Sequence, residues 1–286
     1  MTTKGTKIHE GKSLTARRPT IGVFDSGFGG LTVLKALVEF IPDADYLYFG
    51  DTARLPYGSK SVETVARYAV EAAHFLELHG AALLVIACNT ATALALDRIT
   101  AAAHVPVVGV VEPGAEAAAS ISKNKKVVVI GTEATVSSHA YRKALEARGF
   151  NAREKACPLL VPLVEEGWVE HAVTEEVAGI YLSEAFADGF HDADALVLGC
   201  THYPLIKPLL RRVAPAHVSI VDSAESTARA VAGHLQNLLP PPSQDERRAQ
   251  PRMKFFATDS VEKFRRLGAR FLGRSIEDVQ HVDLKE

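Results

Sequence analysis

The chain has 286 residues, a length that fits one large domain or two of medium size. Hydrophobic residues make up 47% of it, and the formal net charge of −2, with both signs intermixed, gives no reason to expect nucleic acid as a partner. No apolar run is long enough to span a membrane. Three cysteines are too few for a disulfide framework, which favours a cytoplasmic protein with free thiols.

The first 19 residues are polar and basic, and they lack the apolar segment of a secretory signal. We predict a disordered extension over residues 1–19. Short apolar runs then alternate with helical segments. The runs predicted to be strands are residues 20–24, 46–49, 83–87, 107–111, 127–130, 195–198 and 218–221.

Several of these runs are continuously apolar, as is typical of parallel strands covered by helices on both faces. Helices are predicted over residues 31–40 and from the capping residue Ser61 to Gly80. The strand–helix alternation predicts an α/β fold with doubly wound sheets. Residues 239–252 are polar and rich in proline, and they predict an exposed loop. A strand over 253–257 and a helix over 260–272, with Leu267 and Phe271 on its buried face, should then dock on a domain already formed.

An internal repeat lies in the middle of the chain. Residues 84–94 (LVIACNTATAL) and 196–206 (LVLGCTHYPLI) both continue from an apolar strand through Cys to a predicted helix, and VFDSG at 23–27 is echoed by IVDSA at 220–224. The repeat predicts two similar α/β halves that face each other. Because ligands of open α/β sheets bind at the carboxyl ends of strands, Cys88 and Cys200 should lie on opposite walls of one cleft.

The positions of the two cysteines favour a chemical role over a structural one. Buried free cysteines are common, and this is our interpretation of Cys157. Cys88 and Cys200, however, each follow a strand and precede polar residues, where the N–H groups and macrodipole of a following helix would favour a thiolate.

The glycine-rich turn DSGFGG, residues 25–30, has two functional interpretations besides a simple turn. Its backbone N–H groups could hold an anion, as at other helix starts. Asp25 would repel such an anion, and suits an ammonium group or the orientation of a thiol. The turn in DTARLPYGSKS, residues 51–61, could form a lip that faces the substrate.

Cys200 and His202 could form a hydrolase dyad, but a base so close in sequence to its nucleophile is unusual, and Cys88 would then have no role. The chain lacks CxxC and HxxxH spacings, which argues against structural zinc and CxxC redox chemistry. Two thiols flanking one small site fit proton exchange at a carbon, one thiolate removing a proton and the other thiol supplying one to the opposite face. No cofactor is expected, since no lysine lies in a context typical of pyridoxal phosphate. Preorganised dipoles would then have to stabilise the carbanion-like state.

Six ordered motifs, GVFDSGFGGLTVL, YFGDTARLPYGSKS, IACNTATALAL, VVGVVEPG, CPLLVPLVEEG and LGCTHYPLI, resemble glutamate racemases of bacterial cell-wall synthesis, within the aspartate/glutamate racemase family. The resemblance covers nearly the whole chain from Ile21. It implies two α/β domains related by a pseudo-twofold axis, residues 20–113 with 223–286 and residues 114–222, with the active site in the cleft between them. It also implies a cytoplasmic homodimer that converts L-glutamate to D-glutamate for peptidoglycan without a cofactor.

The resemblance further assigns roles to single residues. Cys88 would act on the D-enantiomer and Cys200 on the L-enantiomer, assisted by Asp25 and His202, with Glu165 in support. The positions that match substrate contacts are Asp25, Ser26, Tyr57, Gly58, Asn89, Thr90, Thr201 and His202.

Two other functions stay open. Aspartate racemases share the paired cysteines but usually carry Glu where His202 stands, so the Cys-Thr-His sequence favours glutamate over aspartate or another amino acid. A binding protein on the same fold, such as an amino-acid sensor or a regulator of another protein, would not need the thiols. The long polar N-terminus departs from the family pattern, and some members with such extensions respond to a cell-wall precursor.

Overall fold

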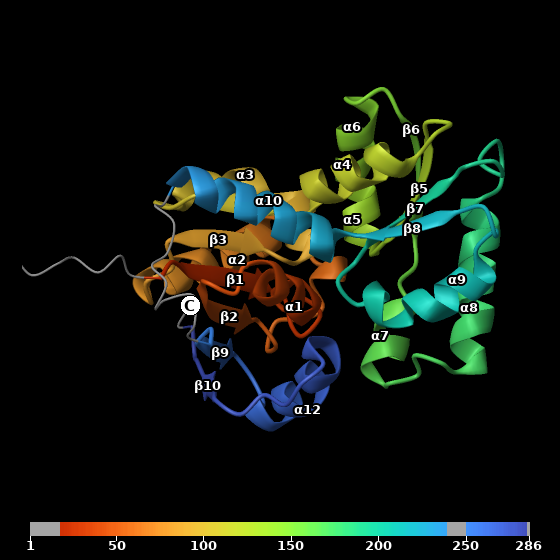
Figure 1. Cartoon of the computed structure of the whole chain (residues 1–286). Helices are drawn as coiled ribbons and strands as arrows, with labels where there is room; N and C mark the ends of the chain where they lie inside the picture. The colour runs from red at the N-terminus through yellow and green to blue at the C-terminus, as the bar shows by residue number, and fades with distance from the viewer. Residues whose placement is uncertain (1–17, 239–249, 285–286) are drawn as a thin grey trace, which may run out of the picture.

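The computed structural model of the protein describes residues 18–238 and 250–284, whose strands form two parallel sheets (Figure 1). The first sheet has the order β10-β9-β2-β1-β3-β4. Its strands are β1 (Thr20–Asp25), β2 (Asp45–Gly50), β3 (Leu83–Ile86), β4 (Val107–Gly109), β9 (Met253–Ala257) and β10 (Val279–His281). The second sheet has the order β6-β5-β7-β8, with β5 (Lys126–Gly131), β6 (Asn151–Ala156), β7 (Ala195–Gly199) and β8 (Ser219–Asp222). All strand pairs are parallel, as predicted.

Helices cover both faces of the sheets. They are α1 (Leu31–Phe40), α2 (Val62–Leu78), α3 (Asn89–Ala102), α4 (Val111–Ile121), α5 (Glu133–Ser138), α6 (Ala140–Glu146), α7 (Leu160–Glu165), α8 (Ala172–Ala185), α9 (Lys207–Val213), α10 (Ser223–Leu238) and α12 (Val261–Leu272), with short 3₁₀ helices η1 (Tyr57–Ser59) and η2 (Tyr203–Ile206). Among the described residues, no helix is long and apolar enough to cross a membrane.

The continuous apolar strands are explained by burial on both sides. Successive side chains of a strand point to opposite faces, so Val23 packs with the α1 side of the first sheet while Phe24 packs with α2 and α3. Ser61 caps α2 by accepting a hydrogen bond from the backbone N–H of Thr64. The C-terminal helix α12 buries Leu267 and Phe271 beside α1, as the sequence predicted.

The chain crosses between the two sheets at two places. It leaves the first sheet after β4 through Val110 and α4, and it returns where β8 passes directly into α10, which packs on α1 and α4 (Figure 1). Both crossings lie near residues 113/114 and 222/223, where the sequence predicts the domain boundaries. We propose these positions as the boundaries. The extension predicted over residues 1–19 lies outside the described residues except Arg18 and Pro19, and the loop predicted over 239–252 lies outside them except for its last three residues.

Two details of the strand prediction were wrong. The strand predicted over 107–111 ends at Gly109, because Val110 adopts helical backbone angles and Val111 begins α4. Two strands at the edges of the sheets, β6 and β10, were missed. Their sequences, NAREKA and VQH, are mostly polar, and most of their side chains are partly or fully exposed, so neither strand shows the apolar run by which the others were found.

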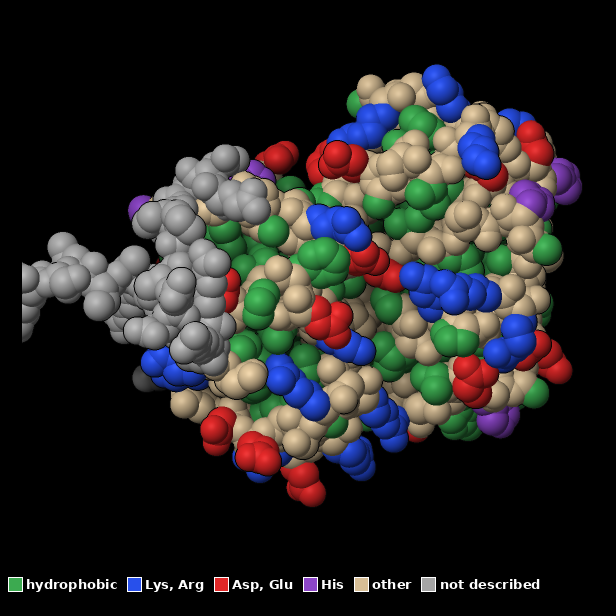
Figure 2. Space-filling model, viewed as in Figure 1, with side chains coloured by type: hydrophobic (Ala, Val, Ile, Leu, Met, Phe, Trp, Pro, Cys, Tyr) green, Lys and Arg blue, Asp and Glu red, His purple; other side chains and the backbone are tan. Residues whose placement is uncertain are grey.

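The two sheets repeat one local arrangement. In the first, β3 leads to Cys88 and pairs with β1, which ends in Asp25 and is followed by Ser26. In the second, β7 leads to Cys200 and pairs with β8, which ends in Asp222 and is followed by Ser223. This repeat supports the predicted pseudo-symmetry. The surface in the view of Figure 2 carries intermixed acidic and basic side chains rather than a patch of one sign.

Candidate active site

Cys88 follows β3 and forms the N-cap of α3. Its sulfur accepts a hydrogen bond from the backbone N–H of Ala91 (3.4 Å), and its thiol donates to Oγ of Ser26 (3.4 Å). Burial, followed by the charge of Asp25, raises the pKa of Cys88 to about 12, against the lowering effect of Ser26 and the Ala91 N–H. The helix start therefore does not suffice to make a resting thiolate, and Cys88 holds its proton near neutral pH.

Cys200 has a different setting from the one predicted. No α-helix follows it directly, because the chain first forms η2 and only then α9. Pro204 and Pro208 lie near the starts of these two helices, and proline lacks the N–H that would continue a preceding helix. The expected helix macrodipole at Cys200 was therefore wrong, and the neighbouring charge comes from a side chain.

That side chain is His202, which is buried between a sulfur and a carboxylate. Its Nδ1 lies 3.9 Å from Sγ of Cys200, and its Nε2 lies 3.1 Å from Oε1 of Glu165, the last residue of α7. Burial lowers the pKa of His202, but the interactions with Cys200 and Glu165 outweigh it and raise the pKa to about 10. The imidazolium form at neutral pH stabilises negative charge that develops on the Cys200 sulfur.

Asp25 lies at the end of β1 and is 1% exposed. Its Oδ2 accepts from the backbone N–H of Gly27 at 2.9 Å, whereas its Oδ1 has no hydrogen-bond partner among the described residues. Burial raises the pKa of Asp25, although the charge of His202 and nearby N–H groups oppose the shift. A buried carboxyl with a raised pKa is suited to exchange a proton.

The glycine turn brings the two halves together. A Cβ at Gly29 would lie 2.2 Å from Oγ1 of Thr201 and 2.6 Å from Nδ1 of His202, and a Cβ at Gly30 would lie 2.5 Å from Cβ of Asp25. Thr32 adds a hydrogen bond of 3.3 Å from its hydroxyl to the carbonyl of Thr201. The glycines therefore allow the Cys-Thr-His segment of the second sheet to approach the first sheet closely, a use that neither functional interpretation of the turn had included.

Each sheet with the helices that cover it is called a unit below, the first unit being that of β1 and the second that of β5. A cavity of about 370 Å³ lies between the two units. Its lining includes all but one of the site residues predicted from the sequence: Ser26, Tyr57, Gly58, Cys88, Asn89, Thr90, Glu165, Cys200, Thr201 and His202. Asp25 is the exception, because it is buried behind the lining, and its contact with substrate stays a prediction. The cavity thus has one thiol from each unit.

The predicted residue Thr90 belongs to a cluster of three threonine hydroxyls, and the other two, Thr132 in the cavity lining and Thr135 behind it, were not predicted from the sequence. Oγ1 of Thr90 lies 2.9 Å from Oγ1 of Thr132 and 3.2 Å from Oγ1 of Thr135, and the last two hydroxyls are 2.9 Å apart. Thr132 follows β5, so the rule that ligands bind at the carboxyl ends of strands could have indicated it.

Tyr57 is anchored by a buried carboxylate. Its phenol donates to Oδ2 of Asp51 at 2.6 Å, and Thr258 of the C-terminal segment donates to Oδ1 of the same side chain at 2.8 Å. The C-terminal segment therefore supports the loop that lines the cavity. Gly58 packs against Thr132, with a Cβ built at Gly58 lying 2.9 Å from Cβ of Thr132.

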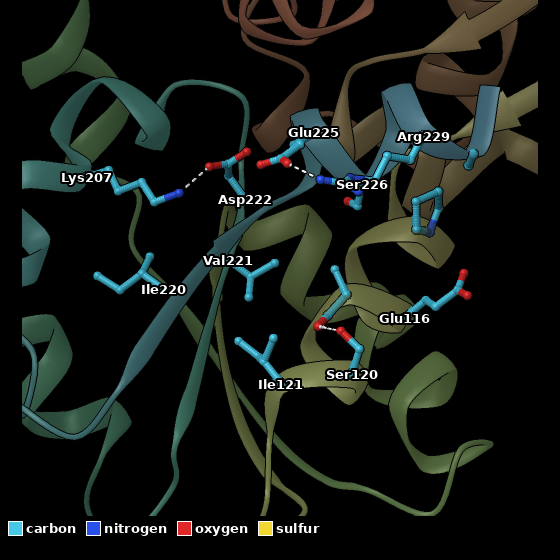
Figure 3. Close-up of a pocket in the computed structure, with 13 residues that line it drawn as sticks. Glu116, Ser120, Ile121, Lys207, Ile220, Val221, Asp222, Glu225, Ser226 and Arg229 are labelled. Carbon is cyan, nitrogen blue, oxygen red and sulfur yellow. Dashed lines mark hydrogen bonds and ion pairs between the residues drawn. The ribbon is translucent and has the colours of Figure 1, made fainter. Parts of the chain in front are cut away.

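A second cavity, of about 640 Å³, lies where β8 passes into α10 (Figure 3). Its two basic side chains are both paired: Lys207 lies 2.6 Å from Asp222, and Arg229 lies 2.6 Å from Glu225. With Glu116 added, the lining has three carboxylates to two cations and no thiol. It is therefore poorly suited to a dicarboxylate, and we assign the smaller, thiol-containing cavity as the candidate active site.

Two parallel α/β units that close over one such cavity define the class of this protein. The family model for Asp/Glu/Hydantoin racemase matches residues 21–231. A glutamate racemase of Koribacter versatilis is 61% identical over 290 residues, which cover 95% of this chain and 99% of that protein.

Solved structures agree. Glutamate racemase RacE1 of Bacillus anthracis has a TM-score of 0.86 at 37% identity, covering 93% of this chain and 98% of that one. The Francisella tularensis enzyme, solved with D-glutamate, has a TM-score of 0.83 at 36% identity and covers 93% and 97%. The chain belongs to the Asp/Glu/hydantoin racemase family.

Proposed function

We propose that the protein is a glutamate racemase, which interconverts L- and D-glutamate by moving the α-proton between two thiols. The observation that carries the proposal is that Cys88 and Cys200 line one cavity from different units. The high identity to proteins named glutamate racemase supports glutamate as the substrate.

The two thiols differ in their surroundings, and this difference suggests the starting state of the reaction. Cys88 holds its proton, while the sulfur of Cys200 faces the His202 imidazolium. In the L to D direction, the Cys200 thiolate removes the α-proton and Cys88 donates its proton to the opposite face. The enzyme is left with a Cys200 thiol and a Cys88 thiolate, and the D to L direction reverses each step.

The carbanion-like intermediate requires stabilisation, because the α-proton of an amino acid is only weakly acidic. We propose that Asn89, Thr90 and Thr201 bind a carboxylate of the substrate, so that charge delocalised into it meets fixed donors. Asp25 would assist Cys88 in regaining a proton, and Glu165 would hold His202 in its charged form.

The test is incubation of L-glutamate with the purified enzyme in D₂O. Optical rotation should fall to zero while deuterium accumulates at the α-carbon, without added cofactor. Absence of both changes would contradict the proposal. L-aspartate and other amino acids in the same assay test the alternative of another racemase in this family.

The biological setting is also proposed. We propose that the protein is cytoplasmic and supplies D-glutamate for peptidoglycan, in which case it should restore growth of a D-glutamate auxotroph. We also propose a homodimer, for which light scattering should give twice the mass of one chain. Activation by a cell-wall precursor is tested by adding the uridine nucleotide precursor to the racemisation assay, with the chain lacking residues 1–17 as a control for the extension.

A further inference from the structure

Asn89, the first residue of α3, has a side-chain amide with one end satisfied and the other end without a partner. The side chain is 2% exposed and lines the cavity. Its Oδ1 accepts a hydrogen bond of 2.6 Å from the phenol of Tyr141, whereas its Nδ2 has no partner among the described residues. Because a buried amide donor without a partner is costly, the Nδ2 group calls for an acceptor supplied by a ligand.

The phenol of Tyr141 fixes which way this amide faces. Oδ1 and Nδ2 can exchange places by rotation about the last side-chain bond, and their shapes are nearly the same. Tyr141 is also hydrogen-bonded to the side chain of Ser223, and because its own O–H is donated to Oδ1 of Asn89, the donor end of the amide points away from Tyr141. In the rotated state, Nδ2 would face the phenol, and Oδ1 would face the acceptor that the ligand supplies. Oδ1 and that acceptor would then both lack a hydrogen to share.

Tyr141 lies in the second unit, whereas Asn89 lies in the first. Tyr141 is fully buried in α6, and its ring is enclosed by backbone: a Cβ at Gly199 would lie 3.1 Å from its Cε2, and a Cβ at Gly114 would lie 3.1 Å from its hydroxyl. Gly199 immediately precedes Cys200, so the ring is fixed to the strand that carries the second thiol. The Tyr141–Asn89 bond therefore sets the amide only when the two units are together.

We infer that Tyr141 is a positioning residue for glutamate binding, which orients the Asn89 amide so that Nδ2 donates to a carboxylate of the substrate. This inference rests on the proposed function. Tyr141 touches Asn89 and not the cavity, so it acts through Asn89 rather than on the substrate.

The experiment is steady-state kinetics of Tyr141→Phe with both enantiomers of glutamate. This change keeps the ring and removes the hydrogen that orients the amide. The KM should rise about tenfold, the size expected for one hydrogen bond to a charged group, with kcat changed less than threefold. In an Asn89→Ala background, Tyr141→Phe should have no further effect on KM.

Tyr46→Phe is the matched control, because the buried Tyr46 phenol donates to the backbone carbonyls of Leu37 and Ile41, and none of these three residues lines the cavity. It should lower the melting temperature and leave KM unchanged. The inference is overturned if Tyr141→Phe leaves KM within twofold of the native value, if it raises KM no more than Tyr46→Phe does, or if it raises KM equally in the Asn89→Ala background.

Asn89→Asp provides a second test in case Tyr141→Phe does not fold. It keeps an acceptor for the Tyr141 phenol but replaces the donor by a carboxylate oxygen, so KM should rise at least tenfold in a folded protein. A native KM in this variant overturns the inference. If the native enzyme itself racemises no glutamate, the proposed function fails, and that result is distinct from a native enzyme that is active and insensitive to these changes.

Discussion

His202 and Glu165 form a partly buried contact in which Nε2 of the imidazole lies 3.1 Å from Oε1 of the carboxylate. His202 immediately precedes η2 and Glu165 ends α7, and their contact leaves Nδ1 of His202 facing the sulfur of Cys200. The carboxylate therefore helps to keep a positive charge beside the thiol that is proposed to act on L-glutamate.

Glu165→Gln should move the alkaline limb of the pH profile. With Glu165 present, the pKa of His202 is raised to about 10, so the imidazolium persists through neutral pH and is lost as the pH rises through that value. Removing the carboxylate lowers this pKa, and the alkaline limb of kcat/KM should shift down by about one pH unit or more. Glu166→Gln is the matched control, since Glu166 does not line the cavity, and it should leave the profile unchanged. An unshifted limb in Glu165→Gln would remove Glu165 from this role.

Both active-site cysteines should be needed to invert glutamate, whereas one cysteine alone should still exchange the α-proton on the face of the substrate that it contacts. Racemisation by Cys88→Ser or Cys200→Ser should fall by about 10³-fold or more. In D₂O, Cys88→Ser should still incorporate deuterium into L-glutamate without inverting it, because Cys200 can remove and return a proton on one face. Cys200→Ser should do the same with D-glutamate.

Cys157→Ser is the control for this pair. Cys157 is buried, its pKa is raised to about 12 mainly by that burial, and it does not line the cavity. Its variant should racemise at the native rate, as measured by circular dichroism of the product mixture. Loss of racemisation in Cys157→Ser, or native racemisation in either of the other two variants, would contradict the two-thiol mechanism.

Gly29→Ala should hold the two units apart. The added Cβ would lie 2.2 Å from Oγ1 of Thr201 and 2.6 Å from Nδ1 of His202, distances that require the Thr-His segment to shift. Since displacement by about 1 Å can cost about 10²-fold in rate, kcat/KM should fall by that order. Gly179→Ala in α8 has no atom closer than 3.7 Å to its added Cβ and should be neutral or slightly stabilising. Equal kinetics for the two variants would show that close approach at Gly29 is not required.

Asp45 should make stability depend on pH in the acid range. Its carboxylate is bound by the guanidinium and the backbone N–H of Arg252, and although burial opposes the shift, these contacts lower the pKa of Asp45. A lowered pKa in the folded state gives stability above the unfolded pKa of about 3.9, which is lost as the pH falls through the folded value. Asp45→Asn should therefore lower the melting temperature by a few degrees at pH 7. The difference should shrink as the pH falls below the unfolded value and disappear once Asp45 is protonated in the folded protein as well, and a difference that persists there would contradict this origin.

The sequence was sufficient where one local signal determined the outcome. Continuous apolar runs located the central strands, and Cys88 and Cys200 were found because each ends such a run. Two of the four edge strands, β6 and β10, were missed because their sequences lack an apolar run, and the surroundings of Cys200 were misjudged because two prolines delay the helix.

Other parts of the site depend on contacts between distant segments. Tyr141 reaches Asn89 from the other unit, and Thr258 reaches Asp51 from the C-terminal segment. Nothing in the local sequence around either residue marks such a partner. The close approach at Gly29 is of the same kind, since the turn itself showed only that glycines were present.

Thermodynamics limits how far the unequal surroundings of the two thiols can affect the kinetics of the proposed reaction. Enantiomers have the same free energy in water, so the equilibrium constant between L- and D-glutamate is unity. The Haldane relation then makes kcat/KM equal in the two directions, whatever the charges around Cys88 and Cys200. The His202–Glu165 contact lies beside one thiol only, and it can give the two enantiomers different kcat values and different KM values. It cannot make kcat/KM for L-glutamate differ from kcat/KM for D-glutamate. Substitution of Glu165 should accordingly lower the efficiency for both enantiomers by the same factor.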